Sequence, residues 1–124
     1  MPHILIDYSR GTEKTVDMAR LVEAVHRAAR SSGHFAPNVV RTLARGADFS
    51  LVADENCANR FIQITVRLAP GRSREVRQTI SRTIFDAAST VVSQEWERGR
   101  MALRVDIAES DPELAHQRNL LPTE

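Results

Sequence analysis

The pattern that most constrains the fold of this 124-residue chain is a strand–helix–strand signature that occurs twice. In the second half, residues 61–68 alternate between apolar and polar side chains, and residues 101–108 do the same, which predicts two half-buried strands. Between them, apolar residues recur every three or four positions, which predicts an amphipathic helix ending near Trp96 and Gly99. One strand–helix–strand unit is therefore predicted over about residues 60–108.

The first half carries the same order over about residues 2–52. A short apolar strand is predicted over residues 2–8, and a helix follows that Gly33 ends as a left-handed cap. A second strand is predicted over residues 39–44. Residues 49–52 either continue that strand after a bend or form a short separate strand.

Hydroxyl side chains are expected to cap both helices, because they accept hydrogen bonds from the unpaired N–H groups of a first helical turn. Thr12 or Thr15 is placed to cap the first helix, and Ser73 the second. The turn residues before the two helices are also alike in composition.

A strand–helix–strand crossover is almost always right-handed and joins parallel strands. The two units therefore predict a single α+β domain over residues 1–124, in which a four-stranded sheet carries two helices on one face. Only the tail, residues 109–124, remains to cover the other face. We therefore expect an oligomer in which sheet packs against sheet.

Composition excludes several classes of function. The chain is 42% hydrophobic and 27% charged, and its formal net charge of +1 gives no basic field for nucleic acid. It contains no apolar run of about 20 residues that would span a membrane, and no signal-peptide core. The lone Cys57 excludes an internal disulfide and favours a reducing, cytoplasmic compartment. The four histidines lack the spacing of a metal site.

The first chemical candidate is Pro2, which follows the initiator Met1 and directly precedes an apolar strand. Removal of Met1 leaves Pro2 with a secondary amine whose lone pair is oriented by the ring. An ordinary α-amino group has a pKa of about 7.7–8.0, and burial or neighbouring cations lower the pKa. Such an amine can act as a general base or a nucleophile. Alternatively, the Met-Pro start has no role, as in many proteins.

Two arginines are the other candidates. Arg72 directly precedes the cap of the second helix, where a guanidinium adds a bidentate donor for a carboxylate to a site that already attracts anions. Arg41 lies within an otherwise apolar strand, where a charge needs a partner or a ligand. The alternatives are a solvated loop side chain for Arg72 and an exposed edge-strand side chain for Arg41.

These residues together resemble a known family. Met1-Pro2-His3 before an apolar strand, the stretch from Gly33 to Arg41, and Ala69-Pro70-Gly71-Arg72-Ser73 leading to Arg77-Gln78 are similar to 5-carboxymethyl-2-hydroxymuconate delta-isomerases. That family belongs to the tautomerase superfamily, which includes macrophage migration inhibitory factor. The resemblance covers roughly Pro2 to Leu121, and the Gly-Arg-Ser turn makes it specific.

The resemblance implies a homotrimer of tautomerase-like subunits and an isomerase that needs no cofactor or metal. Pro2 would be the base that moves a proton in a small carboxylated dienol, and Arg41 and Arg72 would bind its carboxylates and stabilise the dienolate. Family members act in the bacterial meta-cleavage breakdown of homoprotocatechuate. Residues 42–58 depart from the family pattern, because they lack a tryptophan and are more polar, so the substrate stays open.

Two alternatives accompany this hypothesis. The same order of elements fits a non-enzymatic small-molecule-binding or regulatory module with the ferredoxin-like split β-α-β arrangement. Such a module would tolerate an extension of its N-terminus, whereas a Pro2 base would not. The other alternative keeps the fold but makes Pro2 a nucleophile or an activator of water.

Overall fold

The computed structural model describes residues 2–123. Met1, whose removal we expect, and Glu124 lie outside these residues. The strands and helices are, in chain order, β1 (His3–Tyr8), α1 (Met18–Ser31), β2 (Arg41–Gly46), β3 (Arg60–Leu68), α2 (Arg74–Val91), α3 (Ser93–Arg98) and β4 (Met101–Glu109). Short 3-10 turns are formed by Thr12–Lys14, Pro37–Val39 and Pro112–Leu114.

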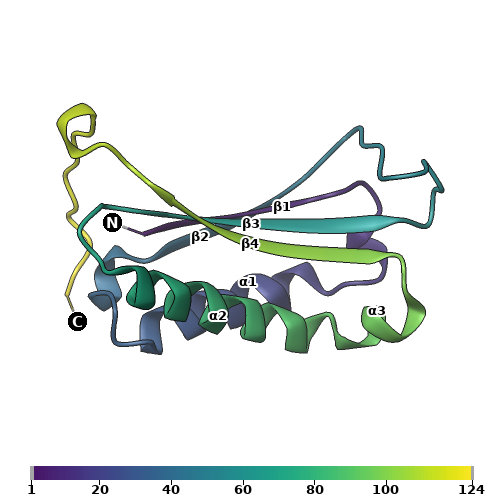
Figure 1. Ribbon diagram of the computed structural model, residues 1–124, viewed down its shortest axis with the longest axis horizontal. Coiled ribbons are helices and arrows are strands. Elements are labelled where there is room, and N and C mark those ends of the chain that lie inside the picture. The colour runs from purple at the N-terminus through teal and green to yellow at the C-terminus, as the bar shows by residue number, and fades with distance from the viewer. Residues whose placement is uncertain (1, 124) are drawn as a thin grey trace.

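The four strands form one sheet in the order β2-β1-β3-β4. β1 is parallel to β2, β3 is parallel to β4, and the two central strands are antiparallel to each other. Figure 1 shows α1 and α2 side by side beneath one face of this sheet. The predicted α+β fold, with two strand–helix–strand crossovers and both long helices on one face, is confirmed.

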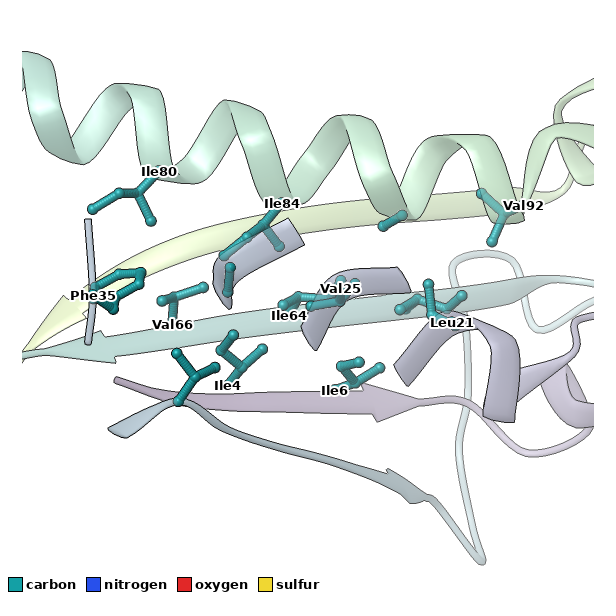
Figure 2. Packing of buried hydrophobic residues seen from close by; sticks show 14 of the residues in the cluster. Ile4, Ile6, Leu21, Val25, Phe35, Ile64, Val66, Ile80, Ile84 and Val92 are labelled. Carbon is teal, nitrogen blue, oxygen red and sulfur yellow. The ribbon is translucent and has the colours of Figure 1, made fainter. Parts of the chain in front are cut away.

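The hydrophobic core lies between that face and the helices, as Figure 2 shows. Alternate residues of the two central strands point into it, and every third or fourth residue of each helix meets them. Complete burial of each large aliphatic side chain contributes about 1.5–3 kcal/mol relative to exposure. The largest fully buried aliphatic side chains are Ile4, Ile6, Leu21, Ile62, Ile64, Leu68, Ile80 and Ile84.

The start of α1 differs from the prediction. Its cap is Asp17, whose carboxylate accepts a hydrogen bond of 3.1 Å from the backbone N–H of Arg20. The hydroxyl of Thr12 instead donates to the carbonyl of Ser9 at 2.7 Å, and Thr12 begins a separate 3-10 turn. The predicted threonine caps were therefore wrong, whereas Ser73 caps α2 as predicted, accepting from the N–H of Val76 at 3.2 Å.

Two further boundaries differ. β2 ends at Gly46, and residues 49–52 form no strand; the side chains of Phe49 and Leu51 are instead 89% and 77% exposed. The helix predicted to run to Trp96 is interrupted at Val92, which separates α2 from α3. Gly33 does follow the end of α1 with a φ of +81°, as predicted for a left-handed cap.

The second face of the sheet stays largely open. Because Ile4 and Ile6 face the helices, Leu5 between them faces the other way, as do Leu43 in β2 and Phe61 in β3 according to the strand register. Leu43 is 37% exposed, and the other two are half-buried. Figure 1 shows the tail descending beside the strand ends and not across this face.

Candidate active site

Pro2 is buried at the start of the central strand β1. Its carbonyl oxygen accepts a hydrogen bond of 3.2 Å from the backbone N–H of Arg41. The start of β2 lies on one side of it, and the end of β3 lies on the other, because His3 pairs with both Arg41 and Arg67. The N-terminal segment is therefore fixed by the sheet, as the apolar strand at the start of the sequence predicts.

Arg41 is the first residue of β2, an edge strand, and its side chain is exposed. The next residue, Thr42, faces the helices, where its hydroxyl lies 2.9 Å from Nδ1 of His26 on α1. Because side chains alternate along a strand, Arg41 points to the open face. Its guanidinium has no hydrogen-bond or ion-pair partner within residues 2–123.

Arg72 lies in the turn between β3 and α2, directly before the cap of α2. Its Nη2 donates a hydrogen bond of 3.2 Å to the carbonyl of His34, and its guanidinium carbon is 4.9 Å from the centre of the Phe35 ring. Phe35 is itself a buried core residue. A cation over an aromatic ring is attracted by the ring quadrupole. Arg72 is therefore half-buried and held in place, unlike a solvated loop arginine.

All three predicted residues lie toward one end of the sheet. Pro2 and Arg41 are joined by the backbone hydrogen bond, and Arg72 follows β3 by four residues at the end where that strand passes Pro2. Figure 1 shows the N-terminus close to the turn from β3 into α2. This end of the sheet is therefore the candidate active site.

Arg67 belongs to the same end and was missed by reasoning from sequence. It is exposed on β3 and pairs with His3 from the side opposite to Arg41. In the alternating pattern of residues 61–68, an arginine at a polar position is typical of a solvent-facing side chain. Only the antiparallel register shows that this position lies beside the first residue of β1.

The C-terminal tail also reaches this end of the molecule. The amide of Asn119 donates to the carbonyl of Asn38 at 3.0 Å, and the amide of Asn38 donates to the carbonyl of Leu121 at 3.3 Å. These reciprocal bonds fix the tail to the turn just before β2. A cavity of about 230 Å³ lies between the tail and the start of the turn that carries Arg72; it is lined by Ala69, Pro70, Ser110, Pro112, Ala115 and Gln117.

The described part of the chain contains no cluster of side chains suited to metal-dependent chemistry. No set of three or more His, Cys, Asp or Glu side chains within residues 2–123 is arranged to hold a metal ion. Cys57 is exposed in the loop between β2 and β3, which joins the opposite ends of these strands from Pro2. None of the helices in this part of the chain has the length and apolar character needed to cross a membrane.

Comparison with known proteins identifies the family. A family model described as 5-carboxymethyl-2-hydroxymuconate isomerase matches residues 2–123. The chain belongs to this family. A 5-carboxymethyl-2-hydroxymuconate Delta-isomerase of Escherichia coli is 25% identical over 119 residues, which cover 96% of this chain and 94% of that protein.

Solved structures agree in fold. A 5-carboxymethyl-2-hydroxymuconate isomerase from Deinococcus radiodurans R1 superposes with a TM-score of 0.86 at 18% identity, covering 95% of this chain and 89% of that one. A structure described as "W0 fused 4-OT wild type symmetric trimer" gives a TM-score of 0.66 at 16% identity, covering 96% and 97%. The tautomerase fold is thereby confirmed.

Family and topology together decide against the non-enzymatic alternative. The family is one of isomerases, so this chain is an enzyme of that class. In a split β-α-β arrangement, another strand separates the two strands of each unit. Here β1 pairs directly with β2, and β3 with β4, so neither unit is split.

Proposed function

We propose that the chain isomerises a carboxylated 2-hydroxymuconate without a cofactor and that Pro2, freed by removal of Met1, is the base. The observation that carries this proposal is the place of Pro2: it is buried at the start of the central strand, and its carbonyl accepts a hydrogen bond from the backbone N–H of Arg41. The family to which the chain belongs supplies the substrate class, with 5-carboxymethyl-2-hydroxymuconate as the first compound to test.

The surroundings of Pro2 favour an uncharged amine. Burial and nearby cations both disfavour an ammonium ion, and both therefore lower the pKa of an N-terminal amine. Pro2 is buried, and Arg41 and Arg72 lie toward the same end of the sheet. A general base works best when its pKa lies close to the working pH, so a lowered amine pKa suits this role.

The proposed proton transfer is internal to the substrate. The lone pair of Pro2 takes the proton of the 2-hydroxyl group, and the electrons of the broken O–H bond stay on the oxygen as the negative charge of a dienolate. The protonated amine then returns that proton to a distant carbon of the chain, while the double bonds shift and the oxygen becomes a carbonyl. Arg41 and Arg72 bind the carboxylates and stabilise the negative charge of the dienolate, which is often the largest catalytic contribution.

We further propose that the active form is a homotrimer. The open face of the sheet carries Leu5, Leu43 and Phe61, which a second copy of the chain would cover. One structure of the same fold is described as a symmetric trimer. The reaction would serve the breakdown of homoprotocatechuate, the pathway expected for this family.

The decisive experiment measures Met1 and activity on the same sample. Intact mass shows whether Met1 has been removed, and ultraviolet absorbance follows the conversion of 5-carboxymethyl-2-hydroxymuconate. We expect rapid isomerisation by the processed wild type and a loss of several orders of magnitude in kcat for Pro2→Ala. Full activity of processed Pro2→Ala would contradict the mechanism.

Two controls make this test specific. Arg27→Ala removes an exposed arginine of α1 that is paired with Glu23, and it should leave turnover unchanged. A short extension before Pro2 converts its amine into an amide and should abolish activity while leaving the fold intact. Borohydride reduction in the presence of a carbonyl compound would trap an iminium if Pro2 acted as a nucleophile instead.

A further inference from the structure

Arg41 and Arg67 flank the first residue of β1 symmetrically. His3 pairs with Arg41 on the parallel side and with Arg67 on the antiparallel side. Residues opposite one another in a sheet point to the same face, so both arginines and His3 lie on the open face. Neighbouring strands are about 4.8 Å apart, which places the two arginine backbones about 10 Å from each other across β1.

These two arginines differ from the others on the same face. Arg45 forms an ion pair with Asp7 at 3.2 Å, and Arg104 forms one with Asp106 at 3.1 Å. Within residues 2–123, the side chains of Arg41 and Arg67 have no such partner. Two like charges that flank one residue repel each other. Because neither guanidinium is engaged by a carboxylate of residues 2–123, both are available at the Pro2 end to bind an anionic ligand.

The proposed substrate has more negative charges than the two assigned arginines can bind. A muconate carries a carboxylate at each end of its six-carbon chain, and the carboxymethyl substituent adds a third. Arg41 and Arg72 account for two of them. Each further carboxylate brought into a site with little water needs a cation or hydrogen-bond donors of its own.

We propose that Arg67 is a further substrate-binding residue, which binds the third carboxylate and so selects the trianionic substrate over dianionic relatives. This inference rests on the proposed function. It holds whether the arginine serves the site of its own subunit or that of a neighbouring copy, because the experiment measures the whole assembly.

The test compares two substrates in one variant. Arg67→Gln removes the charge, and kcat/KM is measured for 5-carboxymethyl-2-hydroxymuconate and for 2-hydroxymuconate, which lacks the third carboxylate. We expect kcat/KM for the trianion to fall by about ten- to hundredfold, mainly through KM, because a hydrogen bond to a charged group is lost. The value for the dianion should change by less than about threefold, and Arg67→Lys, which keeps the charge but not the planar pair of donors, should restore part of the loss.

Arg45→Gln is the matched control, because Arg45 lies on the same sheet face but is already paired with Asp7. It should leave the ratio of the two kcat/KM values unchanged. The competitive inhibition constants of propane-1,2,3-tricarboxylate, with three carboxylates, and of glutarate, with two, give the same comparison. They do not require that the enzyme turn over a dianionic substrate. A purely structural role of Arg67 would alter both substrates equally.

The outcomes separate this inference from the function on which it rests. Turnover by the wild type with an unchanged substrate ratio in Arg67→Gln would overturn the role of Arg67 and leave the proposed function standing. Absence of turnover of either compound by Met1-processed wild type would overturn the proposed function and the role of Arg67 together. A selective loss for three-carboxylate ligands would support both.

Discussion

The guanidinium carbon of Arg72 lies 4.9 Å from the centre of the Phe35 ring, and Phe35 is part of the hydrophobic core. Phe35, which packs beneath the sheet, thereby also holds the guanidinium of Arg72 at the surface. The carbonyl of His34 accepts a further hydrogen bond from the guanidinium. The position of this arginine therefore depends on how α1 ends and not only on its own turn.

Removal of Arg72 and removal of its support should have different effects. Arg72→Ala should lower kcat by about 10²–10³-fold, the usual cost of losing a donor that stabilises developing negative charge. Phe35→Leu keeps the core apolar but removes the ring, and it should lower kcat/KM by only about three- to tenfold. Steady-state kinetics on 5-carboxymethyl-2-hydroxymuconate measures both. A Phe35→Leu enzyme as impaired as Arg72→Ala would contradict a supporting role.

A charge on the open sheet face should prevent assembly. Leu43→Asp places a carboxylate where a second copy is expected to pack, and burial of an unpaired charge is strongly unfavourable. We expect a monomer by sedimentation analysis, with the loss of most activity. Ala19→Asp, on the exposed side of α1, is the matched control and should retain the assembly. A Leu43→Asp protein with the wild-type molecular mass would show that this face is not the interface.

Gly46 provides a test of packing at the sheet edge. A Cβ atom added there would lie 2.8 Å from Cε2 of Tyr8, its partner in the β1–β2 register. Gly46→Ala should therefore lower the free energy of unfolding by about 1–3 kcal/mol, as overpacking does. In a Tyr8→Ser background the same substitution should cost almost nothing. Urea unfolding at one fixed protein concentration measures this double-mutant cycle; equal costs in both backgrounds would exclude the ring as the cause.

His26 should make the stability depend on pH. Burial, followed by the charges of Arg30 and Arg27, lowers the pKa of His26 below its ordinary value of 6.5. The folded protein therefore binds a proton at His26 less readily than the unfolded chain does. The stability contributed by neutral His26 is present above about pH 6.5 and is lost as the pH falls through the lowered pKa.

A variant separates this effect from other titrations. His26→Gln retains a polar group opposite Thr42 but does not titrate. Between about pH 7.5 and about pH 5.5, the wild type should lose more thermal stability than His26→Gln. Equal losses in the two proteins would show that His26 does not contribute.

Much of the fold was predictable because its signals are local. The alternation in β3 and β4 and the apolar stripes of α1 and α2 arise from the period of each element, and the two crossovers then restrict the sheet to few topologies. The misplaced cap of α1 has a local cause as well. Asp17 and Thr12 are both good caps, and the choice between them depends on the contact of Thr12 with Ser9.

The candidate site was only partly predictable because it depends on register. Arg41 and Arg72 stand out in the sequence, one in an apolar strand and the other before a helix cap. Arg67 does not, because a polar residue is expected at every solvent-facing position of an alternating strand. Likewise, the contact between Arg72 and Phe35 joins residues 37 positions apart, which no periodicity reveals.

The pairing of the strands gives the molecule an approximate dyad between β1 and β3. Residues related by this dyad lie on the same face of the sheet, so the helix-facing Ile4 of β1 corresponds to the helix-facing Ile62 at the start of β3. Pro2 lies two residues before Ile4, and the equivalent position is therefore Arg60. Its nitrogen is an amide within a continuous chain, so a free amine can exist at only one of the two related ends. A trimer of such chains would carry three proline bases. If each strand–helix–strand unit were instead a separate chain, the same six units would have six free N-termini.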